Sequence, residues 1–461
     1  MILSAMFVQY QRETPVCFMA RAALERLLDP QRLDSLFLEH AQQQYTRELL
    51  FSTVVDITTE VVLKRKPSIH AAYKARARLA KESVGAISVS DQAVYDKLQN
   101  LELPLSRALV QDSARQAAEA IRTLQAECLP FLAGYRTKII DGNHLKANQH
   151  RLEPLRHLSD GPLPGTVLAI FDQQTATVGD VVLCEDAHAQ ERSLLGEVLD
   201  KVQAKELWIA DRNFCTTAFL CGIADRHARF VIRQHGKLTG ELVGKPSAKR
   251  RCETGWSSEQ KIRIRDAQGE AHLFRRIRVL LDEPTQDGDE EIYILTNLVK
   301  KDASAVEVAE LYRKRWKIEG VFLEIAKCLD CEIKALAYPK AALFCFCVGL
   351  MVHNCVSLLK AAMRSARGEK AVSQLSSYYL GLEIQETYRG MMVALPPETW
   401  KVFGQLSVKE FVATLVEAVT HMVWERYTKS TRGPKKKPPE RRRASEGGHV
   451  STARVLKGQL E

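Results

Sequence analysis

Three acidic residues that lie far apart in the chain are of the type that holds divalent metal ions. Asp141 and Asp211 each end an apolar run, YRTKIIDG (135–142) and ELWIAD (206–211), and Glu319 lies in the segment 301–335. Clustered carboxylates repel one another and need cations, and oxygen ligands favour Mg²⁺ or Mn²⁺. Two such ions about 3.5–4 Å apart can activate an attacking oxygen and stabilise the leaving one in phosphodiester displacement. A single aspartate at a strand end is ordinary turn chemistry, so this prediction rests on the three acids together.

The segment 301–335 is predicted to be one helix, because its apolar residues recur at intervals of three to four. Four side chains would share one face of this helix, at i, i+3, i+7 and i+10: Tyr312, Arg315, Glu319 and Phe322. Charged groups beside bulky apolar neighbours are costly unless they meet charged partners. We therefore expect this face to meet the other two acids.

The order of elements around the two aspartates predicts an α/β fold. Three strands, a helix, a strand, a helix and a strand follow one another, and a further core strand leads into the segment 301–335. The expected ranges are 135–142, 166–173, 175–186, 190–203, 206–211, 216–227, 229–234 and 291–298. Ligands of open α/β sheets gather at the carboxyl ends of strands, which is where Asp141 and Asp211 are placed.

Basic segments flank and interrupt this core. The net charge of +10 and the pI of about 9.0 point to a polyanion, which charge alone does not resolve into DNA, RNA or an anionic membrane. The helical N-terminal part contains the basic stretch 64–81, which fits either a helix-turn-helix DNA reader or a solvated helical hairpin. Eight cations in the β-rich part 235–290 fit either a DNA-contacting surface or a solvated sheet edge: Lys249, Arg250, Arg251, Arg263, Arg265, Arg275, Arg276 and Arg278.

The cysteines and the longest apolar run exclude other classes of protein. The eleven cysteines are scattered rather than framed like a disulfide scaffold, and no signal peptide is evident, so we expect a reducing cytoplasm. The apolar run 341–352 is too short to span a bilayer and predicts a buried helix. The spacing of Cys328, Cys331, Cys345 and Cys347 fits no common zinc site, and free buried cysteines explain the set. There is no P-loop or Rossmann fingerprint.

Three motifs give the chain a resemblance to a known family. Asp141-Gly after a strand, Asp-Arg-Asn-Phe at 211–214 and Tyr-x-x-Arg-Trp-x-Ile-Glu at 312–319 resemble the DDE transposases of bacterial insertion sequences. The similarity covers about 130–360 and is greatest to the branch with a β insertion between the second Asp and the Glu. It implies an RNase H-like fold and Mg²⁺-dependent (or Mn²⁺-dependent) cleavage and transfer of DNA strands in a synaptic multimer.

The resemblance also implies roles for individual residues. Asp141, Asp211 and Glu319 would be the catalytic metal ligands, and Tyr312 and Arg315 would contact DNA near the scissile phosphate. Core packing and a salt bridge to a nearby acid are the alternative for the last two.

Two further cations are less firmly placed by the resemblance. Arg212 would be a phosphate or structural partner. The family has a Lys seven residues after the Glu, but Ala326 stands here and Lys327 comes one residue later, about 100° round the helix. Lys327 is the expected DNA-binding substitute, because its long, flexible stem would let the ammonium reach a phosphate.

The sequence therefore predicts an α/β protein with an RNase H-like catalytic core. We expect a helical DNA-binding region (1–130), the first part of the core (131–234), a β-rich insertion (235–290), the second part of the core (291–335), a helical C-terminal region (336–428) and a basic, disordered tail (429–461). The expected function is cut-and-paste transposition of an insertion sequence. A stand-alone metal-dependent endonuclease and an inactive DNA-binding descendant are the alternatives. The expected partners are double-stranded DNA, as terminal inverted repeats and target, and further copies of the chain, as a homodimer or higher, in a bacterial, nucleoid-associated cytoplasmic setting.

Overall fold

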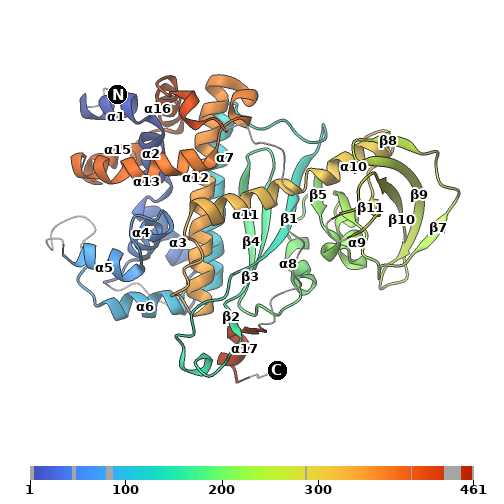
Figure 1. Ribbon diagram of the computed structural model, residues 1–461, viewed down its shortest axis with the longest axis horizontal. Coiled ribbons are helices and arrows are strands. Elements are labelled where there is room, and N and C mark those ends of the chain that lie inside the picture. The colour runs from blue at the N-terminus through green and yellow to red at the C-terminus, as the bar shows by residue number, and fades with distance from the viewer. Residues whose placement is uncertain are drawn as a thin grey trace.

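A large β-sheet stands beside a body of helices (Figure 1). The computed structural model describes residues 5–43, 48–78, 87–285, 288–395, 397–429 and 448–458. Within these ranges it does not describe the side chains of 323–328, 385–390, 392–394 and 397.

Within the described residues, ten strands form one sheet in the order β4-β3-β1-β5-β6-β11-β10-β9-β7, with β8 paired to β9. The strands of its first half are β1 (Arg136–His144), β3 (Thr166–Asp172), β4 (Thr177–Cys184), β5 (Glu206–Ala210) and β6 (Arg229–Arg233). β1, β3 and β4 are antiparallel, whereas β1, β5 and β6 are parallel. Three antiparallel strands followed by two parallel ones are the arrangement of an RNase H-like core, so the predicted fold class is confirmed.

Apolar residues on both faces of these strands bury the sheet between two layers of helices. Ile139 and Ile209 belong to a core shared with α7 (Leu103–Thr123), α10 (Ala305–Arg313), α11 (Trp316–Cys328) and α12 (Pro339–Ser373). Their neighbours Ile140 and Trp208 belong to a core shared with α8 (Leu195–Leu199) and α9 (Thr217–Asp225). Successive side chains of a strand point to opposite faces, so near-continuous apolar runs are what a sheet covered on both sides requires.

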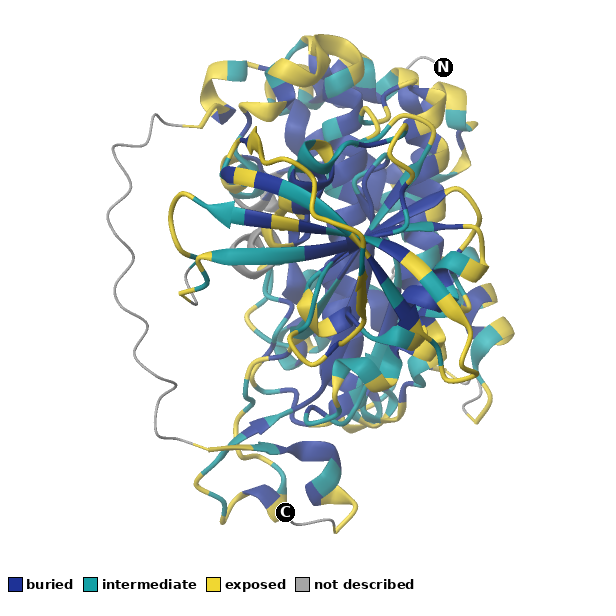
Figure 2. Ribbon diagram, turned by 90° about the vertical axis from the view of Figure 1, so that its right-hand side faces the viewer, coloured by how far each residue is buried: buried dark blue, intermediate teal, exposed yellow. Residues whose placement is uncertain are grey.

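The segment predicted as an insertion extends the core sheet. Its strands are β7 (Glu241–Val243), β8 (Arg250–Cys252), β9 (Gly255–Arg265) and β10 (Ala271–Leu281). β10 pairs with β11 (Glu291–Thr296), which in turn pairs with β6 of the core. The strands cross at steadily changing angles in Figure 2, as the natural twist of a sheet requires.

The helical body is built from both ends of the chain. Its N-terminal helices are α1 (Ala5–Glu13), α2 (Pro15–Leu27), α3 (Pro30–His40), α4 (Phe51–Val62), α5 (Ile69–Ala77) and α6 (Asp91–Asn100). Its C-terminal helices are α13 (Ser377–Ala394), α14 (Pro397–Trp400), α15 (Val402–Gln405) and α16 (Val408–Thr420). The stretch 64–81 contains α5, but 79–86 lie outside the described residues, so the helix-turn-helix prediction stays untested.

The central helix α12 is much longer than the apolar run 341–352 that predicted it. It extends over 35 residues, with a kink at Gly368. By length and composition it is the one described helix that could cross a membrane, but 94% of its apolar window is buried inside the protein. It is therefore a buried helix, as predicted near 340–363, and it continues to Ser373.

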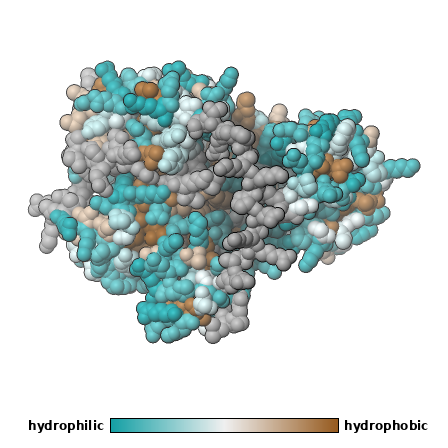
Figure 3. Space-filling model, in the orientation of Figure 1, coloured by the Kyte–Doolittle hydropathy of each residue, from teal (hydrophilic) through white to brown (hydrophobic). Residues whose placement is uncertain are grey.

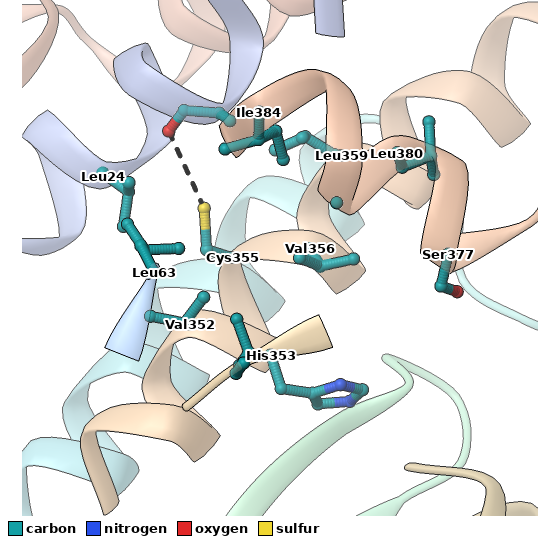
Figure 4. Close-up of a pocket in the computed structure, with 13 residues that line it drawn as sticks. Leu24, Leu63, Val352, His353, Cys355, Val356, Leu359, Ser377, Leu380 and Ile384 are labelled. Atoms are coloured by element: carbon teal, nitrogen blue, oxygen red, sulfur yellow. Dashed lines mark hydrogen bonds between the residues drawn. The ribbon is translucent and has the colours of Figure 1, made fainter. Parts of the chain in front are cut away.

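A small apolar cavity of about 50 Å³ lies beside α12, lined by residues of α2, α12 and α13 such as Leu24, Val352 and Leu380 (Figure 4). The Cys355 Sγ lies against it and is 4.0 Å from the carbonyl oxygen of Ala20. Its lining is almost entirely apolar, so it offers few groups that could orient a polar ligand.

The end of the chain is ordered where the sequence predicted disorder. β12 (His449–Ser451) pairs in parallel with β2 (Gly161–Leu163), and α17 (Thr452–Leu456) follows it. Ala453 and Val455 are buried, and the Arg454 Nε donates to Asp186 at 2.8 Å. The prediction was wrong for 448–458. The few apolar residues of this segment pack against the region of β2, and the composition of the segment alone does not reveal that contact. The KKK and RRR clusters lie outside the described residues.

Candidate active site

Asp141 and Asp211 lie at the same level on two neighbouring parallel strands. Ile139 of β1 is the register partner of Ile209 of β5, and each aspartate follows two residues later. Neighbouring strands are about 4.8 Å apart, so the two side chains leave adjacent positions on the same face, the one covered by α11. β1 continues past Asp141 because it still pairs with β3, Asp141 opposite Ala169. The prediction that Asp141 ends its strand was therefore wrong, whereas Asp211 directly follows β5 as predicted.

The segment predicted as one helix is two. α10 ends at Arg313, Lys314 and Arg315 form a turn, and α11 begins at Trp316. The tightened turn is held by a bond from the Arg315 N–H to the Tyr312 carbonyl, 3.1 Å long. At the start of α10, the Ser304 hydroxyl and the Glu307 carboxylate form a capping box. The turn, which simple periodicity cannot reveal, places Arg315 at the bend beside the sheet.

Arg315 connects two of the three predicted acids. Its Nη2 donates to the Glu319 Oε1 at 2.7 Å, and its Nη1 is 3.4 Å from the Asp141 Oδ2. The arginine is only 9% exposed and its Nε is buried without a hydrogen-bond partner. Burial disfavours its charge, but Tyr312, Asp141 and Glu319 raise the pKa of the guanidinium above its usual value. Arg315 therefore sits where the charges of the acids meet.

The electrostatics place all three acids in one neighbourhood. Burial of the Asp141 carboxyl raises its pKa from 3.8 to about 7, the positive charge of Arg315 opposes this, and the charges of Asp211 and Glu319 raise it further. The Asp211 carboxylate also caps the short helix after β5, accepting from the Asn213 N–H at 2.7 Å. The negative charges of Asp211 and Glu319, which lie far apart in the sequence, thus both raise the pKa of the Asp141 carboxyl.

The other predicted side chains are less favourably placed for DNA. Tyr312 is 7% exposed, and its ring is part of the core under the sheet, where burial raises the pKa of the phenol. Arg212 faces Asp289, with 3.8 Å between Nη1 and Oδ2. Tyr312 and Arg315 thus show the core packing and salt bridge that were the alternative for them, and DNA contact stays a prediction. The Lys327 side chain lies outside the described residues.

Sequence reasoning missed an acid that lies next to this cluster. The Glu191 carboxylate approaches Gly142, and its neighbours are the Asn213 amide at 3.5 Å and the His144 Nε2 at 4.0 Å. Burial raises the pKa of this carboxyl, and the charge of Asp211 raises it further. In the sequence, Glu191 lies in an acidic segment between β4 and β5. It does not follow a strand directly, so the pattern that identified Asp141 and Asp211 does not select it.

The donor set fits a hard divalent cation. Asp141, Asp211 and Glu319 offer carboxylate oxygens, which suit Mg²⁺ and Mn²⁺, and one buried arginine does not balance three acids. The raised pKa of Asp141 reflects the cost of ionising this buried carboxyl beside two other acids. Another cluster that could hold a metal, Asp266, Glu270 and His272, is formed by a turn in which Asp266 accepts the N–H groups of 268 and 270, and nothing else points to a ligand there.

The cations of the β7–β10 region are largely engaged within the sheet. Four of the eight form ion pairs with acids in or beside their own strands: Arg251 with Asp282, Arg263 with Glu241, Arg275 with Glu259 and Arg278 with Glu291. Arg276 lies 3.5 Å from the ring centroid of Tyr293. Figure 3 shows a mostly hydrophilic surface at this end of the molecule. The pairing favours the solvated-edge alternative over a dedicated DNA surface.

Buried free thiols also account for the cysteines. Cys331, Cys345 and Cys347 are buried and free, and burial raises the pKa of each thiol. No described cysteine belongs to a group of potential metal ligands. The Cys328 side chain lies outside the described residues.

Comparisons with known proteins agree with this geometry. Residues 132–331, less than half of the chain, match the family model described as transposase DDE domain. No curated protein matches. One similar solved structure is the cryo-EM structure of the piggyBac transposase synaptic complex with hairpin DNA, with a TM-score of 0.41 and 10% identity over 88% of this chain and 85% of that chain. The family match confirms the resemblance that the motifs indicated.

Proposed function

We propose that this chain, whose residues 132–331 are a transposase DDE domain, cuts DNA at the ends of an insertion sequence and joins the freed ends to target DNA. The observation that carries the proposal is the bridge made by Arg315 between Asp141 and Glu319, beside Asp211 on the neighbouring strand. Two carboxylates from separate elements meet one buried guanidinium, and the third acid lies at the adjacent position of the neighbouring strand. The arrangement supplies metal ligands and a phosphate-binding cation at one point.

The residues divide the work by their chemistry. Asp141, Asp211 and Glu319 would hold Mg²⁺ or Mn²⁺, which when bound stabilises charge on the attacking and leaving oxygens of a phosphodiester. Once its two carboxylates are engaged in that way, the Arg315 fork is free to donate two parallel hydrogen bonds to phosphate oxygens. The Tyr312 ring is buried in the core, and its phenol interacts with Arg315. No nucleotide cofactor is needed, because strand transfer exchanges one phosphodiester for another.

The proposed partners follow from this chemistry. Terminal inverted repeats and target DNA are the double-stranded substrates, and pairing two ends requires at least a homodimer. The setting would be the bacterial nucleoid in the cytoplasm. Light scattering of the protein with and without end DNA tests the assembly, since a mass that stays monomeric on saturating end DNA contradicts a synaptic complex.

Incubation with linear DNA that carries candidate terminal repeats, in the presence of Mg²⁺, tests the reaction. Joined products support the transposase, indiscriminate cutting supports a stand-alone endonuclease, and a shifted band without breakage supports an inactive DNA-binding protein. Asp141→Asn, or chelation with EDTA, should abolish breakage and spare DNA binding. Asp200→Asn is the matched control. This aspartate lies in the same α/β part of the chain, but it is 79% exposed. Cleavage that survives Asp141→Asn undiminished would show that the metal site is assigned wrongly.

A further inference from the structure

Glu191 is held against the strand that carries Asp141. It begins the short 3₁₀-helix η2 (Glu191–Leu194), which leads into α8 on the other face of the sheet from α11. A Cβ placed on Gly142 would be 1.8 Å from the Glu191 Oε1 and 2.6 Å from its Cδ. Gly142 has no positive φ, so a side chain at this position is opposed not by backbone conformation but by the Glu191 carboxylate, which would have to shift. The glycine that follows Asp141 makes room for a carboxylate.

This carboxylate is poorly compensated in the protein as it stands. Its side chain is 14% exposed, and the basic side chain that the structure places beside it is His144, 4.0 Å away and 51% exposed itself. The Asn213 amide donates at 3.5 Å, the long limit of a hydrogen bond. A half-buried carboxylate beside the charge of Asp211 is costly unless a stronger cation is added.

The site is unequally balanced between its two sides. On the α11 side, Arg315 hydrogen-bonds to both Asp141 and Glu319. Glu191 approaches Asp211 from the α8 side, and Asn213 joins these two acids, because its backbone N–H donates to Asp211 and its side-chain amide donates to Glu191. Asp211 and Glu191 come from two elements, and among the described residues their negative charges are not balanced by a cation on this side. Such a pair of carboxylate oxygens is suited to bind a divalent cation.

We infer that Glu191 is a fourth carboxylate of the metal centre and that it holds a cation together with Asp211, with which it shares the partner Asn213. The inference rests on the proposed function, since it adds a ligand to the centre proposed there. Glu191 comes from an element that none of the three motifs includes. Gly142 is then a positioning residue, because it lets Glu191 reach the level of the aspartates.

Binding of Mn²⁺ to the full-length protein without DNA tests the inference, by calorimetry and by the electron paramagnetic resonance signal of free Mn²⁺. Glu191→Gln should lower the affinity at least about ten-fold, as loss of a ligand or its immediate support does. It should not lower the thermal stability of the metal-free protein, because it removes a repelling charge. Glu197→Gln, on the exposed side of α8, is the matched control and should bind Mn²⁺ like the wild type.

A second pair of variants keeps the test decisive if Glu191→Gln folds poorly. Gly142→Ala places a methyl group where the carboxylate lies and should weaken Mn²⁺ binding while retaining every acid. Adding Glu191→Gln to it should then weaken binding little further, because both changes remove the same ligand. Full additivity of the two losses would overturn the inference.

Asp211→Asn separates the inference from the proposed function. If Asp211→Asn weakens Mn²⁺ binding and Glu191→Gln does not, Glu191 is not a ligand and the proposed function stands. If neither variant weakens it, the metal centre itself is wrong. If Glu191→Gln lowers metal-free stability and leaves the Mn²⁺ affinity unchanged, the role of Glu191 is structural and the inference fails.

Discussion

Replacing Asp141 with Asn should stabilise the metal-free protein above neutral pH, although it should destroy the active site. The pKa of this carboxyl is about 7 in the folded protein, against 3.8 for an exposed aspartate. A difference of about 3 pKa units, at about 1.36 kcal/mol each, makes the ionised carboxylate cost roughly 4 kcal/mol in the native state at pH 8. The side chain is 15% exposed, so solvent screening removes little of this cost. A neutral amide carries none of it.

The pH dependence has a definite sign. Because the folded pKa lies above the unfolded one, the stability linked to this group is fully present below pH 3.8 and is lost progressively until the pH passes about 7. The stabilisation by Asp141→Asn should therefore be roughly 4 kcal/mol at pH 8, roughly 2 kcal/mol at pH 5 and about 0.5 kcal/mol at pH 4. Urea unfolding in EDTA at the three pH values measures it, and addition of Mn²⁺ should reverse the order, because only the wild type can gain from the cation.

A matched aspartate on the neighbouring strand should respond in the opposite way. Asp172 is equally deep in the sheet, but Arg136 and Lys138 lie against it, and they lower its pKa despite its burial. Asp172→Asn should cost about 3 kcal/mol at pH 8, as breaking a buried ion pair does. If Asp141→Asn proves equal to or less stable than the wild type at pH 8 without metal, the acids are not crowded as described.

Three further outcomes are expected. Arg315→Lys keeps the positive charge but loses the guanidinium fork that spans two carboxylates. Single-turnover cleavage of end DNA should therefore fall about ten- to a hundredfold, while Mn²⁺ binding is retained. Full cleavage activity would show that a point charge at this position is sufficient. Asn354→Leu removes the bonds that the buried Asn354 makes to the backbone of Val178 and to a neighbouring hydroxyl, and should lower the free energy of unfolding by about 3 kcal/mol; an unchanged urea midpoint would refute this. Among the described cysteines, Cys128 and Cys184 are the partly exposed ones, so iodoacetamide should label these two in the native protein and the others on unfolding, as peptide mass spectrometry would show; labelling of the α12 cysteines in the native protein would contradict their burial.

The local chemistry of the site was readable from the sequence because it depends on neighbours along the chain. Apolar runs that end near an acid predicted the strands that carry Asp141 and Asp211, and their order predicted that the two would meet. The motif spacing placed Arg315 one helical turn before Glu319, and the two are hydrogen-bonded. The domain division that the sequence predicts, and the chemistry of these residues on DNA, stay predictions.

Contacts between distant segments were not readable in this way. The turn at Lys314 and Arg315 interrupts a pattern that fits one helix, because helical periodicity continues across a single tight turn. The cations of β9 and β10 are basic in sequence but find acids on paired strands, and that pairing depends on strand register. Their availability to DNA could be judged only from the sheet.

The sequence by itself determined which residues could do chemistry and which elements carry them, since strand and helix patterns, caps and motif spacing are properties of a few consecutive residues. Only the tertiary structure decided that Glu191 fills the space beside Gly142 and that β12 closes onto β2 from nearly 300 residues away. Such contacts depend on the shape of packed surfaces and on the burial of groups from separate elements. No local pattern encodes them, because each partner is ordinary until the other lies against it.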